Sequence, residues 1–586
     1  MRSLRRRRAL IGLMLVSPAL AFVAVFFLAP LVLMIWMSLH RWPLLGHTSW
    51  IGLGNYAAMG SDPVWWRSLG FTVEYTAIIT PILIVLGFGL ALLVRRQRRG
   101  VGFFRTVFFM PYVIGFAAAS YLFVWLIDPD VGLLDKTLQA LGVTSSPVQW
   151  LSTRTLALFA VVLMIVWKTV GFTMLLFMGG LQGIPDDVHE AASVDGAGRL
   201  TTLRRVTVPL LRRTIASTVI LAVVGSMLAF DQFYIVTNGG PANQTLTVVY
   251  WIYNSSFVNF QLGYGAAMSV VLMVILMIIT GRSSICSGIR PSDDHHDRTD
   301  TAHPAPPAAL AAAPGDARRP WWAICGLVAL MFLFPLAMVV FTVLKTPSEA
   351  AATPAHYLPH HISGQNFRAL SDADIWRYVL NSAVVSLGTV LGTVILATLA
   401  GYGFARYRFP GRSLLFLGTL MTLMVPFQAL LTPLYSVLLF LHMANSLVGL
   451  TLVYITFQLP FSLFVMRNAF AEIPQDIEDA AAMDGATTLA TLRRVMVTVA
   501  KPAVVTVALF AFFSAWNEFL AALIFLSDQA RYTLPVFLTT LVVGKLGAIN
   551  WGLLEAGVVV TIAPCLVIFL LLQRYYVRGL MSGAVR

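Results

Sequence analysis

Polar and charged side chains stand inside long apolar stretches of this chain. Placing a polar or charged side chain in an apolar environment costs free energy, so each such residue is a candidate for a functional role. Carboxylates and amides can hydrogen-bond the hydroxyl groups of a ligand, while aromatic rings cover its apolar surfaces. The structural alternatives are an ion pair of Lys168 with an acid, or plain aromatic packing. The candidate ligand-binding residues are Lys168, Phe230, Asp231, Gln232, Trp516, Asn517 and Glu518.

No catalytic constellation stands out in the sequence. There is no G-x-x-x-x-G-K-[ST] phosphate loop, because the Gly544-Lys545 pair is followed by Leu546 and lacks the upstream glycine. Three cysteines, odd in number and widely spaced, indicate neither a disulfide framework nor a metal site. The Asp/His cluster at 293–297 is interpreted as a solvated patch rather than a metal site. We expect no catalytic residue, no metal and no ATP hydrolysis in this chain.

The composition predicts a membrane protein. Of 586 residues, 58% are hydrophobic and only 11% are charged, and the mean hydropathy is +0.80. Soluble domains typically carry roughly 25% charged residues. The net charge of +14 comes from clusters between apolar runs, which is the positive-inside pattern of membrane proteins. We therefore expect membrane lipid, and not nucleic acid, as a partner.

Twelve apolar runs are long enough to cross a bilayer, which takes about 20 helical residues each. The first run follows four arginines, but it is longer than the core of a cleaved signal peptide and is interpreted as a retained helix. The predicted fold is all-α, with six spans in each half. The runs lie near 9–39, 71–94, 103–127, 155–181, 214–236 and 264–281, then near 321–344, 377–403, 413–441, 446–470, 502–526 and 553–573.

A short polar signature occurs once in each half, between the fourth and fifth spans. EAASVDGA begins at Glu190, DAAAMDGA begins at Asp479, and a basic run follows each copy. Each residue of the second copy lies 289 positions after its counterpart. A fixed register between apolar segments indicates two copies of one membrane module, rather than two unrelated helix-turn-helix loops. The signature residues are Glu190, Ala191, Ala192, Asp195, Gly196 and Ala197, and Asp479, Ala480, Ala481, Asp484, Gly485 and Ala486.

The residue types of the signature suit a docking helix. Small residues allow a short helix to approach a partner backbone closely. The acids can cap helix N-termini or pair with basic groups. Gly196 can end the helix in a left-handed conformation, and Gly485 can do the same in the second copy.

The distribution of Lys and Arg predicts the orientation and the domains. With six spans per half, all basic clusters fall on one side, whereas the loop at 237–263 has no Lys or Arg. Both termini, the linker and both signature loops should therefore face the cytoplasm, with the two halves in the same orientation. The predicted domains are a first module at 1–282 (core 70–282), a flexible Pro/Ala-rich linker at 283–320 and a second module at 321–586 (core 376–574).

The chain resembles the permeases of binding-protein-dependent ABC transporters of the carbohydrate-uptake family, the maltose and glycerol-3-phosphate type, with two permease subunits fused. The second copy departs from the family pattern, with Asp479 in place of glutamate and Thr498 in place of the proline present as Pro209. Besides the signature loops, the motifs that carry the resemblance are WIGLGNY from Trp50, FRTVFFMP from Phe104, TNGGP from Thr237, FARYRFPGR from Phe404, SAWNEF from Ser514 and QRYYVRGL from Gln573.

The resemblance implies a permease of the bacterial inner membrane that imports a sugar, oligosaccharide, polyol or glycerol phosphate by alternating access. The signature residues would couple to a cytoplasmic ABC ATPase dimer, which would bind ATP and Mg, so this chain needs no cofactor. An extracytoplasmic solute-binding protein would deliver the carbohydrate substrate. The candidate ligand-binding residues would line the path, and neutral or amino sugars rank above phosphates because only Lys168 would suit a phosphate.

Two other classes of function remain as alternatives. An ion-coupled secondary transporter can also consist of two six-helix halves and would use a membrane acid such as Glu518 for coupling. A membrane scaffold or sensor would keep the fold without transport. The paired signature loops argue against the first, and the polar residues within the spans argue against the second.

Overall fold

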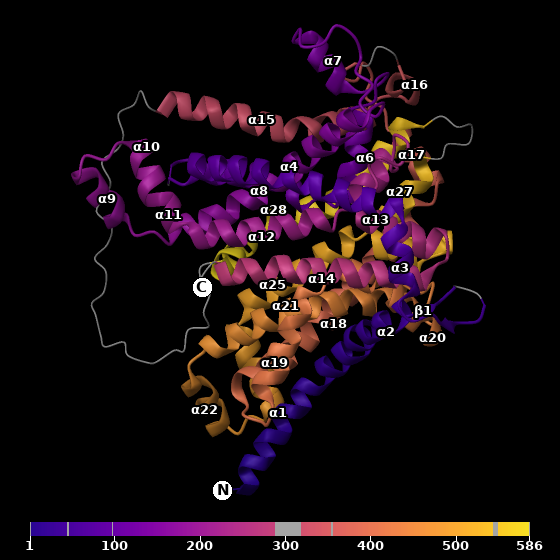
Figure 1. The fold of residues 1–586 in the computed structure, drawn as a ribbon. Helices are drawn as coiled ribbons and strands as arrows, with labels where there is room; N and C mark the ends of the chain where they lie inside the picture. Colours follow the sequence, from indigo (N-terminus) through magenta and orange to yellow (C-terminus); the bar gives the residue numbers. More distant parts are fainter. Residues whose placement is uncertain are drawn as a thin grey trace.

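The computed structural model describes residues 2–43, 46–96, 98–286, 318–352, 356–542 and 549–584. These residues form a bundle of long helices, and their one sheet is a short antiparallel hairpin of β1 (His40–Arg41) and β2 (Ser49–Trp50) (Figure 1). The predicted all-α fold is confirmed. Most of the predicted linker at 283–320 lies outside the described residues.

The first half contains α1 (Arg2–Val23), η1 (Ala24–Leu28), α2 (Ala29–Ser38), α3 (Gly54–Ser61), α4 (Pro63–Val94), α5 (Val101–Phe109), η2 (Met110–Val113), α6 (Phe116–Leu126), α7 (Leu133–Ala140), α8 (Arg154–Gln182), α9 (Asp186–Val194), α10 (Arg199–Thr202), η3 (Leu203–Thr207), α11 (Val208–Leu210), α12 (Arg212–Met227), η4 (Phe233–Thr237), α13 (Val248–Tyr253), η5 (Asn254–Val258) and α14 (Leu262–Cys286).

The second half contains α15 (Arg318–Val343), α16 (Pro347–Ala350), α17 (Gln365–Asp372), α18 (Ile375–Arg406), α19 (Arg412–Met421), η7 (Thr422–Met424), η8 (Phe427–Leu430), α20 (Leu431–Phe440), α21 (Leu447–Glu472), α22 (Gln475–Met483), α23 (Thr488–Thr491), η9 (Leu492–Met496), α24 (Val497–Val499), α25 (Lys501–Asn517), α26 (Leu520–Phe525), η10 (Gln529–Arg531), α27 (Leu534–Val542) and α28 (Trp551–Ala584).

Within the described ranges, eight helices are long and apolar enough to cross a membrane, and four bent pairs raise the number to as many as twelve. Each of the twelve apolar runs in the sequence overlaps one of these helices or pairs. Local capping sets where several of them begin. The side chain of Asp62, for example, accepts a hydrogen bond from the backbone N–H of Val64 at 2.8 Å, and Pro63 stands at the first position of α4.

The third span of each half is broken rather than straight. The chain bends by 96° between Val101–Val113 and Phe116–Leu126, and by 93° between Arg412–Met424 and Phe427–Phe440. At these bends Ile114 and Val425 have extended backbones, which interrupt the helical hydrogen bonds. The runs predicted as single spans at 103–127 and 413–441 are therefore each two helical segments.

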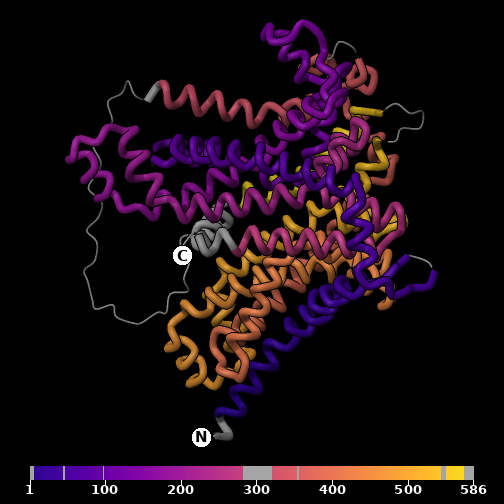
Figure 2. The backbone as a smooth tube through the Cα atoms, viewed as in Figure 1, coloured from indigo at the N-terminus to yellow at the C-terminus, as the bar shows by residue number. Residues whose placement is uncertain are grey.

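The first helix of each half packs against the other half. Helix α1 lies along α18, where a Cβ added at Gly12 would stand 2.6 Å from the Cβ of Tyr407. Helix α15 lies along the first half, and the indole of Trp167 donates a hydrogen bond to the carbonyl of Phe332 at 3.0 Å. Figures 1 and 2 show the indigo α1 beside the orange helices and α15 beside the purple ones. The two halves are thus interlocked across the boundary that the sequence predicts.

Candidate functional site

A cavity of about 550 Å³ lies between the two halves and is lined by residues from both. It gathers six of the seven residues predicted to bind a ligand, although they come from three segments far apart in the sequence. These six are Lys168, Phe230, Asp231, Gln232, Asn517 and Glu518.

The fifth span of each half is interrupted at this cavity. Helix α12 ends at Met227, earlier than the predicted limit of 236, and helix α25 ends at Asn517, earlier than the predicted limit of 526. Beyond these ends, Glu518 has an extended backbone and α26 begins at Leu520. Interrupted helices leave backbone groups free at membrane depth, which is tolerated where the chain lines a cavity. The two interruptions thus place polar groups from both halves around one space.

Glu518 is held in place by three hydrogen bonds. Its carboxylate accepts from the Tyr454 hydroxyl at 2.5 Å and from the backbone N–H groups of Ala521 at 2.8 Å and Ala522 at 3.1 Å. The last two bonds cap the N-terminus of α26, where a negative charge is favourable. The carboxylate therefore holds the interrupted span together at the cavity wall.

Asn517 links the two halves beside the cavity. Its side-chain Nδ2 donates a hydrogen bond to the carbonyl of Val113 at 3.0 Å, and the Sγ of Cys565 stands 3.5 Å from its Oδ1. Gly115 makes room for this amide, because a Cβ at Gly115 would lie 2.9 Å from the Oδ1 of Asn517. The broken third span of the first half is thus fastened to the fifth span of the second.

Lys168 projects from α8 into an aromatic corner of the cavity. Its ammonium lies 4.1 Å from the ring centroid of Phe116 and 5.4 Å from that of Tyr112, which suits cation–π attraction. It donates one hydrogen bond, to the carbonyl of Tyr112 at 3.3 Å. In the part of the chain that the structure describes, Lys168 forms no ion pair, so the alternative of an ion pair with an acid is not realised.

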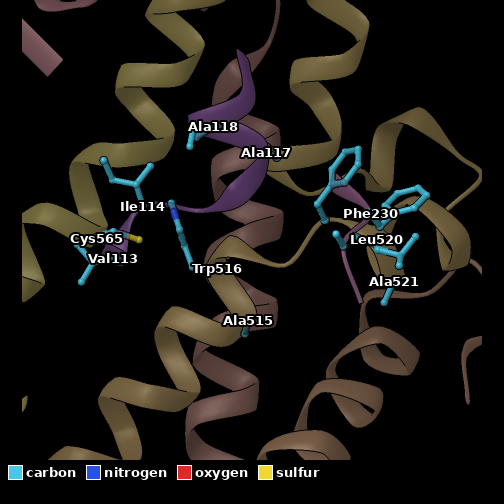
Figure 3. Close-up of a cluster of buried hydrophobic side chains, with 14 of the residues drawn as sticks. Val113, Ile114, Ala117, Ala118, Phe230, Ala515, Trp516, Leu520, Ala521 and Cys565 are labelled. Atoms are coloured by element: carbon cyan, nitrogen blue, oxygen red, sulfur yellow. The ribbon is translucent and has the colours of Figure 1, made fainter. Parts of the chain in front are cut away.

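Trp516 does not line the cavity. Its side chain is 4% exposed, and its indole N–H donates to the carbonyl of Thr561 at 3.0 Å on α28. Figure 3 shows it among buried apolar side chains near Val113 and Ile114. The placement of Trp516 on the ligand path is therefore corrected to a packing role, because the face of α25 that carries it is turned toward α28.

Further lining residues escaped the sequence interpretation. Gln428 and Gln458 could have been predicted from the sequence, since each is a polar residue inside an apolar run. The aromatic lining residues could not, because apolar spans contain many aromatic side chains that only pack. The additional lining side chains include Tyr112, Phe116, Phe427, Gln428, Gln458, Phe510, Phe513 and Ser514.

The two signature loops, residues 186–210 and 475–499, have the same structure. Each helix, from α9 to α11, recurs 289 positions later, from α22 to α24. The substitution of Thr498 for the family's proline leaves these bounds in register. Figure 1 shows α9 and α22 at the same end of the bundle, away from α7 and α17 at the opposite end. The repeat predicted from the sequence is thus a repeat in structure.

The glycines of the signature end the short helices, as predicted. Gly196 has φ +74° and Gly485 has φ +77°, the left-handed region that favours glycine. In the first loop the N–H of Ala197 reaches the carbonyl of Ala192 at 3.0 Å, and the N–H of Gly196 reaches that of Ser193 at 3.1 Å. This pair of bonds is a Schellman motif. The second loop repeats both bonds at positions 485 and 486.

Burial of the signature residues is also the same in both copies. The third residue of each signature, Ala192 and Ala481, is buried at 8% exposure. The eighth residue of each signature, Ala197 and Ala486, is half-buried. The remaining signature residues face outward, namely Glu190, Ala191, Asp195, Gly196, Asp479, Ala480, Asp484 and Gly485.

The second loop alone has an ion pair to a membrane helix, among the described residues. The Nε of Arg406, at the end of α18, lies 2.6 Å from the Oε1 of Glu478 on α22. Arg406 also donates to the carbonyl of Ile473. Burial raises the pKa of Glu478 above its ordinary value, although the guanidinium of Arg406 opposes this. At the equivalent position the first loop has His189, so the two loops are anchored differently.

Comparison with known proteins identifies relatives for both halves. A family profile described as "Binding-protein-dependent transport system inner membrane component" matches residues 83–284 and 372–582. The sn-glycerol-3-phosphate transport system permease protein UgpA of Agrobacterium fabrum is 37% identical over 272 residues, which are 46% of this chain and 91% of that protein. The trehalose/maltose transport system permease protein MalF of Thermococcus litoralis is 32% identical over 279 residues, 47% of this chain and 93% of that protein.

Among solved structures, a bacterial ABC transporter involved in the import of the acidic polysaccharide alginate matches with a TM-score of 0.42 and 21% sequence identity. The match covers 46% of this chain and 100% of that chain.

Proposed function

The chain belongs to the family of binding-protein-dependent transport system inner membrane components, and we propose that it is the fused permease of an ATP-driven ABC importer for a sugar or related carbohydrate. Each of the two matched regions forms one permease module, and related permeases align with less than half of this chain. Their names refer to trehalose and maltose, lactose, and glycerol phosphate. These names support a carbohydrate, and they do not support the ion-coupled alternative.

One observation carries this proposal: each signature loop continues directly into the helix whose far end lines the cavity. In the first half the chain turns by 70° between Arg199–Leu210 and Arg212–Met227, and in the second by 83° between Thr488–Val499 and Lys501–Asn517. A displacement of either loop therefore moves α12 or α25, and with it the cavity wall. This connection suits alternating access, in which ATP binding to a partner shifts the permease between two states.

The cavity favours a neutral or amino sugar over a phosphate. Its aromatic rings, among them Phe116 and Phe427, can cover the C–H faces of a sugar. Asp231, Gln428 and Gln458 offer acceptors and donors to its hydroxyl groups. Lys168 is the one basic residue among the described lining residues and is accompanied by two acids, which disfavours a substrate with a double negative charge.

The partners follow from the same proposal. A cytoplasmic ABC ATPase dimer would dock on the two signature loops and would bind ATP and Mg. A solute-binding protein would deliver the carbohydrate at the opposite end, near α7 and α17. Both termini would then face the cytoplasm, in agreement with the basic clusters at that end.

The test is purification of the tagged chain from its native membranes, followed by reconstitution in vesicles. We expect a phosphate-loop ATPase in stoichiometric amount and sugar uptake that needs ATP and is blocked by vanadate. A preparation that contains no ATPase, yet accumulates sugar under an ion gradient, would overturn the proposal in favour of a secondary transporter.

A further inference from the structure

The arginines that follow α4 differ in their exposure. Arg95, Arg96, Arg98 and Arg99 come directly after the apolar span Pro63–Val94. Arginines at the end of a span commonly face water and set the orientation of the chain. Arg96 and Arg99 are exposed in this way, whereas Arg98 is half-buried, and its Nη1 is a buried atom that has no hydrogen-bond partner among the described residues. A buried guanidinium N–H without an acceptor costs free energy, so Arg98 has a donor to offer to an anion.

Arg98 is positioned by a helix of the second half. Its guanidinium carbon lies 5.1 Å from the ring centroid of Trp321 on α15, a distance that suits cation–π attraction. The indole N–H of Trp321 donates a hydrogen bond to the carbonyl of Leu93 at 2.9 Å. Gly100 has φ +78° and leaves room for Trp322, because a Cβ at Gly100 would stand 2.4 Å from the Cη2 of that ring. Residues of both halves therefore surround the guanidinium.

Arg105 of α5 adds a further positive charge at the end of α4. Its Nε and Nη2 donate to the carbonyl of Val94 at 3.1 and 2.6 Å, and its Nη2 donates to the carbonyl of Arg95 at 3.3 Å. These bonds hold Arg105 beside the residues that precede Arg98. The group called here the Arg98 site consists of Arg95, Arg98, Arg105, Trp321 and Trp322.

The helices around the Arg98 site supply no acid to balance these charges. The sequence has no Asp or Glu between Glu74 and Asp128, and none between Asp316 and Glu349. Helix α8, which packs on α4 and α5, also contains none. Glu74 itself forms an ion pair with Arg154. The Arg98 site is therefore an excess of positive charge that suits an anionic ligand.

The surface beside the Arg98 site is aromatic. Trp322 is 45% exposed and Phe103 is 61% exposed, while the buried ring of Phe104 lies 5.6 and 5.5 Å from the rings of the two tryptophans. Tryptophan is enriched where a membrane meets water. The two spans that meet here end at Val94 and begin at Pro320, so the arginines lie at the depth of lipid headgroups. The exposed rings lie at the apolar ends of the same two spans.

We propose that the Arg98 site binds the phosphate of an anionic phospholipid such as phosphatidylglycerol. The guanidinium fork of Arg98 matches phosphate oxygens, which would accept from its Nη1. The acyl chains would cover the exposed rings of Phe103 and Trp322. Basic sites between membrane helices are known to hold such headgroups.

A lipid at this place would join the two halves. Arg98 and Arg105 belong to the first half, and α15, with Trp321 and Trp322, belongs to the second. Figure 1 shows α15 beginning at the end of the bundle where α10 lies. The bound phosphate would hold the start of α15 against α4 and α5. This role does not depend on the solute that the chain carries.

Free inorganic phosphate offers the same charge as the headgroup. The exposed rings of Phe103 and Trp322 favour the lipid, because a free phosphate leaves them uncovered. The experiment must therefore separate the charge of the ligand from its acyl chains.

The test is a lipid titration of the full chain, purified and delipidated in a neutral detergent. The melting temperature is followed while phosphatidylglycerol, phosphatidylcholine or inorganic phosphate is added. We expect phosphatidylglycerol to raise the melting temperature more than the zwitterionic lipid or the free anion does at the same concentration. Native mass spectrometry of the same samples counts the phosphatidylglycerol molecules that stay bound.

Three variants locate the effect. In Arg98→Gln, half-maximal stabilisation should need about tenfold more phosphatidylglycerol, because a charge-assisted hydrogen bond is lost. Arg98→Lys keeps the charge without the planar fork and should lie between this variant and the unmodified chain. Arg6→Gln removes the same charge from an exposed position of α1, and its titration should match that of the unmodified chain.

Each contrary outcome overturns part of the proposal. Equal titrations of the unmodified chain and Arg98→Gln would remove the lipid from the Arg98 site. Equal stabilisation by phosphatidylcholine would show that acyl chains act alone, and equal stabilisation by inorganic phosphate would show an anion site without a lipid. If Arg98→Gln does not fold, Arg98→Lys and the comparison of the three ligands on the unmodified chain still decide the assignment.

Discussion

The amide of Asn517 donates a hydrogen bond to the carbonyl of Val113 at 3.0 Å, and these two residues belong to different halves of the chain. The bond joins the end of α25 to the broken third span of the first half. Both residues line the cavity. A change in cavity shape that separates the halves must therefore break or redirect this bond.

Replacement of Asn517 by alanine is predicted to loosen this link. The substitution leaves the carbonyl of Val113 without its donor, and loss of a buried hydrogen bond costs about 1–3 kcal/mol. We expect a lower melting temperature in detergent and slower sugar uptake. The amount of bound ATPase should not change, because the loops lie far along α25 from this bond. A lower melting temperature together with loss of the bound ATPase would contradict a local role for Asn517.

Substitutions of Asp231 and Glu518 are predicted to have different effects on uptake and on melting temperature, although both residues are acids that line one cavity. Among the described residues, no side chain hydrogen-bonds the carboxylate of Asp231, whereas that of Glu518 caps α26. Asp231→Asn should reduce uptake by about tenfold or more, with unchanged melting, if its charge serves the substrate. Glu518→Gln should lower the melting temperature, because the cap is weakened by about 1 kcal/mol.

Uptake assays and thermal melting of the same preparations check both variants. Gln458→Leu provides a comparison, because it removes another cavity group that lies on neither interruption. Unchanged uptake in Asp231→Asn, at normal protein levels, would remove Asp231 from the substrate site.

Burial of Glu478, which outweighs the opposing effect of Arg406, is predicted to make stability depend on pH. The pKa of Glu478 is raised in the folded protein, so the folded state binds an extra proton between the ordinary and the raised pKa values. Stability should therefore fall as pH rises through this window. Glu478→Gln should abolish this part of the dependence, as measured by melting temperature against pH.

Arg406→Gln tests the other partner of the pair. It leaves the carboxylate of Glu478 in a site that is mostly buried, at 16% side-chain exposure, without its counter-charge. We expect a loss of at most about 3 kcal/mol. Adding Glu478→Gln to this variant should restore part of the loss, and His189→Ala, at the equivalent place in the first loop, is the matched control. Additive losses would show that the pair does not couple.

Much of this architecture could be predicted because it is determined by local sequence patterns. The twelve apolar runs, the 289-residue register and the left-handed glycines each depend on residue types close in the sequence. The polar residues within spans pointed to the cavity for the same reason, since an apolar environment leaves them few other roles.

The remaining features depend on contacts between distant segments. Which face of α25 meets the cavity is decided by packing against α28, so Trp516 lies outside the cavity while its neighbours Asn517 and Glu518 line it. The breaks near Pro111 and Pro426 were not foreseen, because proline is tolerated in straight membrane helices. Packing of α1 and α15 across the halves has no local signature at all.

That exchange of first helices predicts how the two halves behave as separate chains. Residues 1–300 and 301–586, expressed together, should assemble and support uptake without a covalent link, because α1 packs on α18 and α15 packs on α5 and is hydrogen-bonded by Trp167 of α8. Related permeases such as MalF of Thermococcus litoralis have the length of one half. Expressed alone, each half leaves the contact surface of a helix uncovered and should be degraded or aggregate.

Co-purification of the two halves on a single tag measures their assembly. Gly12→Leu, which would drive a side chain into Tyr407, should abolish it, whereas Leu10→Ala, at an exposed position of the same helix, should not. Halves that fold separately and fail to associate would show that the linker, and not the exchanged helices, holds this chain together.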